Sequence, residues 1–145
     1  MRVAIGCDHA GFQLKPVVGA VLNELGHEIV DCGTWSAESV DYPDYGQAVA
    51  NKVAMGEAEL GVVICGTGIG ISIAANKVPG VRAALCHDTF SARMSRAHND
   101  ANVLALGSRV IGSGVVEDIV RAFMQESFAG GRHTRRVAKL EKPVV

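Results

Sequence analysis

The residues with the greatest potential for chemistry follow apolar runs in the chain. Cys65 ends the run LGVVIC, and a glycine-rich segment, residues 66–70, comes directly after it. Glycines after a buried strand let backbone N–H groups approach a ligand closely, and the start of the next helix adds partial positive charge. Such a loop would stabilise a phosphate or an oxyanion formed in a reaction. The same donors would favour a thiolate at Cys65, which can act as a base or a nucleophile.

Both features also have a structural explanation. Segment 66–70 would serve equally well as a tight strand-to-helix turn, and a free cysteine often packs as a small buried hydrophobe. The segment does not fit the dinucleotide fingerprint G-x-G-x-x-G, because Gly68-Ile69-Gly70 is followed by Ile71, Ser72 and Ile73. It is not a P-loop either, because no Lys-Ser/Thr pair follows.

Further ionisable residues stand at the ends of other predicted elements. Asp8 and His9 follow the first strand, where the carboxylate would bind a ligand or simply cap a turn. His98 closes a helix and would act as a general acid or base near neutral pH, or interact only with the helix dipole. Arg132 and Arg136 are four apart, so on a helix they would share a face and clamp a phosphate, or remain a solvated surface.

Strand-like and helix-like patterns alternate along the chain, which predicts a parallel sheet with helices on both faces. In such sheets, ligands bind beyond the carboxyl ends of the strands, where Asp8, Cys65 and Arg109 fall. The predicted strands are residues 2–7, 27–31, 60–65, 81–86 and 103–106. The predicted helices are about 12–25, 43–55, 88–98 and 115–128, with a further one that opens within or just after segment 66–70 and runs to about 77. We expect a single domain, residues 1–145, with a basic tail at about 130–145.

Composition narrows the class of protein. Fourteen basic and 15 acidic residues give a charge of −1, which argues against a nucleic-acid binder. Five basic residues and one acid between Gly130 and Val145 suit a small anion. No apolar run approaches the ~18 residues of a membrane helix, and the N-terminus lacks the features of a signal peptide, so we expect no membrane partner and a cytoplasmic location.

The cysteine spacing gives little support for a metal or redox motif. No CxxC pair is formed by the four cysteines, which are Cys7, Cys32, Cys65 and Cys86. We therefore expect neither a metal site nor an organic cofactor.

Five segments taken together resemble the ribose-5-phosphate isomerase B family, which also includes allose-6-phosphate and galactose-6-phosphate isomerases. They are GCDHAGF (6–12), DYPDY (41–45), ICGTGIGISIAANK (64–77), HNDANVLALGSRV (98–110) and GGRHTRRV (130–137), and they span almost the whole chain. The resemblance implies a three-layer α/β/α sandwich, Rossmann-like, with a five-stranded parallel sheet of order 2-1-3-5-4. It also implies homodimers, or dimers of dimers, with active sites at the subunit interface.

The resemblance further implies roles for individual residues. Cys65 would be the base that moves a proton between two carbons of a phosphorylated sugar, and His98 would be the acid that opens the sugar ring. The enediolate oxygens would be held, with help from the Thr67 hydroxyl, by the N–H groups of Gly66, Thr67, Gly68, Ile69 and Gly70. Sugar hydroxyls would contact Asp8 and Asn99, and the phosphate would be bound or flanked by His9, Arg109, Arg132 and Arg136. By this analogy His98, Asn99 and Arg109 would come from the neighbouring chain relative to Cys65.

Three other functions stay open at this stage. A 6-phosphorylated hexose would fit the same strand-end residues as ribose 5-phosphate. The fold alone would also allow a non-catalytic nucleotide- or flavin-binding module, although the broken glycine fingerprint speaks against it. A thiol redox protein is disfavoured because no CxxC is present.

Overall fold

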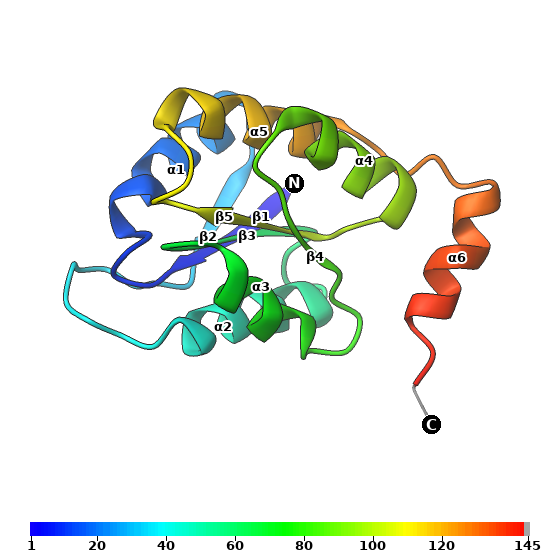
Figure 1. Cartoon of the computed structure of the whole chain (residues 1–145), viewed down its shortest axis with the longest axis horizontal. Coiled ribbons are helices and arrows are strands. Elements are labelled where there is room, and N and C mark those ends of the chain that lie inside the picture. Colours follow the sequence, from blue (N-terminus) through cyan, green and yellow to red (C-terminus); the bar gives the residue numbers. More distant parts are fainter. Residues whose placement is uncertain (144–145) are drawn as a thin grey trace.

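Five parallel strands lie between two layers of helices in the computed structural model, which describes residues 1–143 (Figure 1). The strands are β1 (Arg2–Cys7), β2 (Glu28–Asp31), β3 (Leu60–Cys65), β4 (Ala83–Leu85) and β5 (Val103–Gly107). The helices are α1 (Lys15–Glu24), preceded by a 3₁₀ turn (Phe12–Leu14), α2 (Tyr42–Ala54), α3 (Ile69–Asn76), α4 (Thr89–Asn99), α5 (Ser113–Gln125) and α6 (Arg132–Leu140).

The strand order is β2-β1-β3-β5-β4, and every neighbouring pair is parallel. The order predicted from the resemblance is therefore confirmed, as is the three-layer α/β fold. This order makes β3 the central strand and places β1 and β5 on either side of it, so the ends of these three strands lie next to one another.

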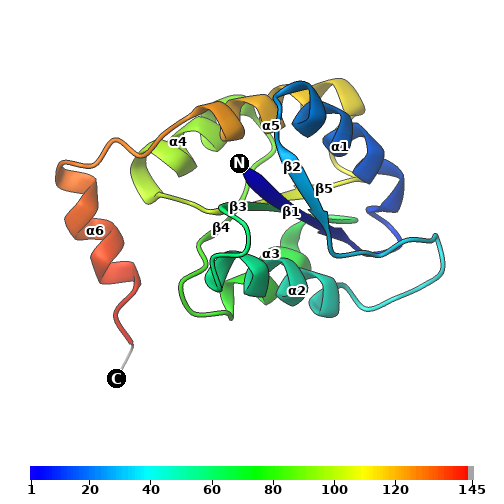
Figure 2. The ribbon, with the colours of Figure 1, turned by 180° about the vertical axis from the view of Figure 1, so that it is seen from behind.

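Two apolar cores hold the layers together. Helices α1, α4 and α5 cover one face of the sheet, and α2 and α3 cover the other (Figures 1 and 2). Side chains alternate along β1, so Ile5 packs in the first core and Ala4 in the second. All six residues of β3 are buried, as expected for a strand covered on both faces.

The helix boundaries follow local chemistry. Asp88 caps α4 as predicted, because its carboxylate accepts the N–H of Ser91 at 2.7 Å. The first helix differs from its prediction, since residues 12–14 form a 3₁₀ turn and the α-helix begins only at Lys15, with a proline in its first turn. Helix α5 ends three residues before its predicted end, because Glu126 adopts an extended backbone.

The edge strand β4 has three residues, whereas the sequence pattern predicted six. The N–H of Arg82 donates to the side chain of Asn102 at 2.8 Å instead of to a strand carbonyl. The β4–β5 ladder therefore starts only at Ala83, which lies opposite Val103.

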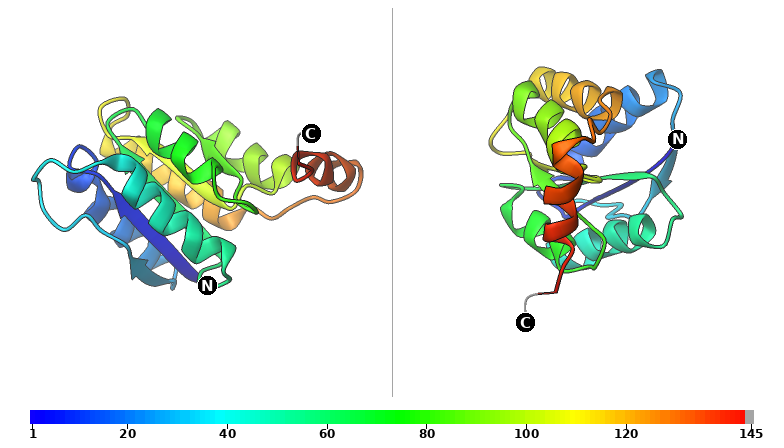
Figure 3. Two further views of the ribbon diagram at one scale, coloured as in Figure 1. Left: turned by 90° about the horizontal axis from the view of Figure 1, so that it is seen from below. Right: turned by 90° about the vertical axis from the view of Figure 1, so that its right-hand side faces the viewer.

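The basic tail folds into helix α6, which stands away from the sheet at one end of the molecule (Figures 1 and 3). Its main contact with the body is with α4. Residues 144 and 145 of the predicted tail lie outside the described residues. None of the helices within residues 1–143 has the length and apolar character needed to cross a membrane. The cytoplasmic location stays a prediction.

Candidate active site

The carboxyl ends of β1, β3 and β5 meet at one edge of the sheet. Cys65, the last residue of β3, lies opposite Gly107 of β5. The chain continues this pairing beyond the ladder, since Ser108 N–H donates to the Cys65 carbonyl at 2.9 Å. On the other side, Asp8 N–H donates to the Ile64 carbonyl at 3.2 Å. The three strand ends thus hold Asp8 and Cys65 side by side.

The sulfur of Cys65 lies against the glycine loop that follows it. The N–H of Gly68 donates to Sγ at 3.1 Å. Gly68 also caps α3 with a left-handed backbone, φ +76°, so the positive end of that helix begins directly beside the sulfur. A donated N–H and a helix N-terminus both stabilise negative charge on sulfur. The placement agrees with the sequence analysis, whereas the role of Cys65 as a base stays a prediction.

Arg109 lies over the first glycine of the loop. Its Nη1 would be 3.2 Å from a Cβ built on Gly66, and its backbone N–H donates to the Gly66 carbonyl at 2.9 Å. The resemblance suggested that Arg109 comes from the neighbouring chain relative to Cys65. The structure corrects this expectation, because β3 and β5 are adjacent strands and bring the two residues together within one chain.

Asp8 and His9 are both engaged in local hydrogen bonds. Asp8 is 6% exposed, and its Oδ1 accepts the N–H of Gly11 at 3.0 Å, so the turn-capping explanation holds for that oxygen. The Nδ1 of His9 accepts the N–H of Val40 at 3.1 Å. In the neutral ring the proton is therefore on Nε2, which leaves that nitrogen as the donor toward a ligand.

Tyr42 is a site residue that the sequence analysis did not single out. It begins α2, and a Cβ built on Gly70 would lie 2.5 Å from its ring, so the tyrosine packs flush against the glycine loop. The signal was present in the DYPDY segment, which belonged to the resemblance without a role for any of its residues.

These residues line a cavity of about 390 Å³, within the range typical of small-molecule sites. Its lining is Asp8, His9, Ala10, Tyr42, Cys65, Gly66, Thr67, Ile69, Gly70 and Arg109. We call Asp8, His9, Cys65, segment 66–70 and Arg109 the loop cluster. A larger hollow of about 600 Å³ lies between α6 and the β4 edge, but only Asn99 of the predicted site residues reaches it. The chemistry is therefore assigned to the smaller cavity.

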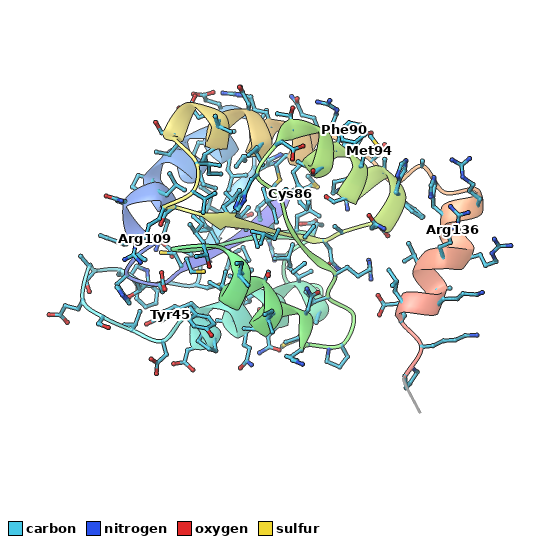
Figure 4. The ribbon with its side chains drawn as sticks, viewed as in Figure 1. Tyr45, Cys86, Phe90, Met94, Arg109 and Arg136 are labelled. Atoms are coloured by element: carbon cyan, nitrogen blue, oxygen red, sulfur yellow. The ribbon has the colours of Figure 1, made fainter. Side chains whose placement is uncertain are left out.

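The remaining predicted residues gather at the opposite end of the molecule. We call His98, Asn99, Arg132, His133 and Arg136 the helix-end cluster. The ring of His98, at the end of α4, stacks on that of His133 in α6, with centroids 4.3 Å apart and planes 13° apart. Figure 4 shows Arg136 at this end and Arg109 at the other.

His133 is a second residue that the sequence analysis missed. Burial, then His98, and then the guanidinium groups of Arg132 and Arg136 lower the pKa of His133. Its ring holds α6 against α4, so it supports the two arginines that the sequence predicted as a phosphate clamp.

A single chain thus separates the predicted site into two halves. The loop cluster has a thiol, backbone donors and one guanidinium, and the helix-end cluster has an exposed imidazole and two arginines. Within residues 1–143 no group of three or more His, Cys, Asp or Glu side chains is placed to hold a metal ion.

Comparison with known proteins agrees with this fold. The sequence model of the family described as Ribose/Galactose Isomerase matches residues 3–140. Ribose-5-phosphate isomerase B of Escherichia coli (strain K12) is 54% identical, over 94% of this chain and 91% of that protein. A putative sugar phosphate isomerase of Bacillus subtilis (strain 168) is 50% identical, over 97% and 95%. The solved structure of Clostridium thermocellum ribose-5-phosphate isomerase B superposes with a TM-score of 0.95 at 55% identity, over 97% and 95%. The chain therefore belongs to the ribose/galactose isomerase family and is a sugar isomerase.

Proposed function

We propose that the protein interconverts ribose 5-phosphate and ribulose 5-phosphate through an enediolate, with Cys65 as the base. One observation carries the proposal: the Cys65 sulfur lines the cavity and accepts the N–H of Gly68 at 3.1 Å. A thiolate held in this way is positioned to take a proton from a substrate carbon above the glycine loop. Membership of an enzyme family also favours an isomerase over a nucleotide- or flavin-binding module or a thiol redox protein.

The proposed reaction is a balanced proton shift. The Cys65 thiolate removes the proton from C2 of the open-chain aldose and returns it to C1, while the hydroxyl proton moves from O2 to O1. Negative charge develops on the oxygens between these two steps. The backbone N–H groups of segment 66–70, together with Thr67, are placed to stabilise it.

The phosphate would bind in the same cavity. Arg109 and His9 both line this cavity, where the guanidinium supplies a charge-assisted donor and the Nε2 of His9 a second donor. Asp8 has one carboxylate oxygen engaged by Gly11 and a second one for a sugar hydroxyl. Binding the phosphate away from the reacting carbons orients them over the thiol.

We propose that a second copy of the chain completes the site. The helix-end cluster lies too far from Cys65 to act in the same chain, so His98 and Asn99 would come from a partner, with Arg132 and Arg136 adding to its phosphate anchor. Exposed apolar residues support such a contact. Ile69 and Ile73, one turn apart on α3, are 53% and 54% exposed, and Phe90 of α4 is 65% exposed. A homodimer, or a dimer of dimers, would cover them.

The proposal is tested first by replacing the thiol. Cys65→Ala should lower kcat for ribose 5-phosphate by about 10²–10⁴-fold, the usual contribution of a general base. Cys86→Ala is the matched control, because Cys86 is a buried thiol outside the cavity and should lose stability but not kcat. A Cys65→Ala variant that retains most of its rate would refute the proposed base.

The shared site has its own test. Cys65→Ala and His98→Asn homodimers should both be inactive, and unfolding and refolding them together should restore activity. Half of the dimers would be mixed, each with one intact site, so about one quarter of the wild-type rate is expected for a two-fold symmetric dimer. No recovery in a mixture shown by mass spectrometry to contain mixed dimers would refute a site built from two chains.

A 6-phosphorylated hexose is the alternative substrate, favoured by the family description, which includes galactose as well as ribose. Parallel rates on ribose 5-phosphate, allose 6-phosphate and galactose 6-phosphate distinguish the candidates. We propose ribose 5-phosphate because two relatives named ribose-5-phosphate isomerase B are more than half identical to this chain.

A further inference from the structure

The loop between β2 and α2, residues 32–41, crosses the carboxyl end of β1 beside the loop cluster (Figures 1 and 2). It has no helix or strand of its own. Its start is bonded to the end of β1, since Cys7 N–H donates to the Gly33 carbonyl at 2.7 Å and Thr34 N–H donates to the Cys7 carbonyl at 2.8 Å. Its end contacts the site directly, through the bond from Val40 N–H to His9 Nδ1.

Lys15 of α1 reaches the start of this loop. Its Nζ lies 2.6 Å from Asp31 Oδ1 and donates to the Thr34 carbonyl at 2.7 Å. The Lys15 side chain is only 11% exposed, and its ammonium lies 5.7 Å from the centre of the Trp35 ring. A largely buried ammonium is tolerated only when it is paired and hydrogen-bonded. These contacts therefore fix where the loop leaves the sheet.

The position of the loop start is passed on to α2. A Cβ built on Gly33 would lie 2.8 Å from the Tyr45 ring and 3.0 Å from the Trp35 ring, so Gly33 is held between the two aromatic side chains. Tyr45 is in the first turn of α2, which begins at Tyr42 on the glycine loop. Figure 4 shows Tyr45 at the same end of the molecule as Arg109. Displacing residues 33–35 would thus move both ends of the loop.

We propose that Lys15 is a positioning residue for the isomerase site. Its ammonium holds the 32–41 loop against the end of β1, and the loop in turn fixes the His9 ring and the start of α2, which carries Tyr42. Lys15 touches neither the cavity nor the substrate, so it acts only through these neighbours. The expected effect of Lys15 on catalysis rests on the proposed function. The contacts of Lys15 with the loop do not depend on that function.

The first test is Lys15→Met, which keeps the length of the side chain and removes its charge. We expect KM for ribose 5-phosphate to rise about tenfold, equal to about 1.4 kcal/mol, while kcat changes much less, since the affected groups bind the phosphate end. Lys15→Arg should recover part of the affinity. Lys52→Met is the matched control, because Lys52 also pairs with a carboxylate, Glu57, but lies on the surface away from the cavity. A purely structural role would lower the melting temperature and leave KM unchanged.

The second readout does not depend on catalysis. In ¹⁵N NMR spectra, the His9 ring nitrogens should report loss of the Val40 bond in Lys15→Met and retain it in Lys52→Met. Asp31→Asn, which removes the charge opposite Lys15 but keeps an acceptor for the Gly33 N–H 2.9 Å away, should shift KM and the His9 signals in the same direction, and it decides the question if Lys15→Met does not fold.

Wild-type KM and wild-type His9 signals in either folded variant would overturn the inference. Failure of the wild-type protein to isomerise any sugar phosphate would refute the proposed function instead, and the His9 signals would still decide whether Lys15 holds the loop.

Discussion

Gly68→Ala should damage both the fold and the site, and its cost can be estimated from the structure. Gly68 has φ +76°, a left-handed backbone that costs an alanine roughly 1–2 kcal/mol. Its new Cβ would lie 2.8 Å from the Leu106 carbonyl carbon and 3.0 Å from the Gly107 nitrogen, which belong to the backbone of β5 and cannot move aside. Forcing a methyl group into such a contact costs about 1–3 kcal/mol more, for a total of about 2–5 kcal/mol.

Gly56→Ala separates the two contributions. Gly56 has φ +74°, but a Cβ there would meet nothing within 4 Å, so this variant carries only the backbone cost of about 1–2 kcal/mol. Thermal unfolding followed by circular dichroism, at one protein concentration, should show a melting temperature lowered by on the order of 10 °C for Gly68→Ala and by clearly less for Gly56→Ala.

The two variants should also differ in activity. Relief of the clash must push the loop away from β5, and with it the N–H that donates to the Cys65 sulfur. A displacement of about 1 Å in a reacting group costs about 10²-fold in rate, so kcat should fall strongly in Gly68→Ala and stay near wild type in Gly56→Ala. Equal melting temperatures together with full kcat in both variants would show that the close approach of the loop to β5 has no consequence.

Three further predictions follow from the geometry. Arg136→Ala should raise KM for ribose 5-phosphate about tenfold or more, since a hydrogen bond to a charged group contributes about 1.5–3 kcal/mol. Arg135→Ala is the control, and the same KM in both variants would exclude Arg136 from the phosphate anchor. Burial and nearby cations lower the pKa of His133 in the folded protein, so its contribution to stability is complete above the unfolded pKa near 6.5, falls as the pH drops below that value, and levels off below the folded pKa. His133→Phe should therefore reduce the fall in melting temperature between about pH 8 and 5. Parallel plots of melting temperature against pH for the wild type and the variant would contradict this prediction. Burial raises the pKa of Cys7 and of Cys86, so iodoacetamide near neutral pH should modify both only after denaturation, as measured by mass spectrometry, and modification of the native protein would contradict this.

Local chemistry was enough to predict most of the elements. The alternation of apolar segments gave the type and order of the strands and helices, and Asp88 marked the start of α4 because a cap is a contact within four residues. The short β4 could not be predicted, because the side chain that interrupts it, Asn102, is 20 residues away from Arg82. The strand order came from the resemblance and not from the pattern.

The site was predictable where it depends on strand ends and hidden where it depends on distant contacts. Cys65 and its loop follow each other in sequence, so their meeting could be expected. The stacking of His98 on His133 joins two helices across 35 positions, and no local sequence pattern predicts it. The separation of His98 from Cys65 was expected only from the resemblance, because the sequence pattern does not say which copy of the chain supplies each residue.

The structure of helix α6 bears on when a newly synthesised chain becomes active. It has nine residues, too few for a helix to be stable in water without neighbours. Its contacts with the body include the His98–His133 stack and an ion pair from Arg82 to Glu141 just beyond its end. In the proposed dimer the two arginines of this helix would serve the other copy. A newly made single chain would then be folded but inactive. Isomerase activity would appear only at protein concentrations high enough for dimers to form.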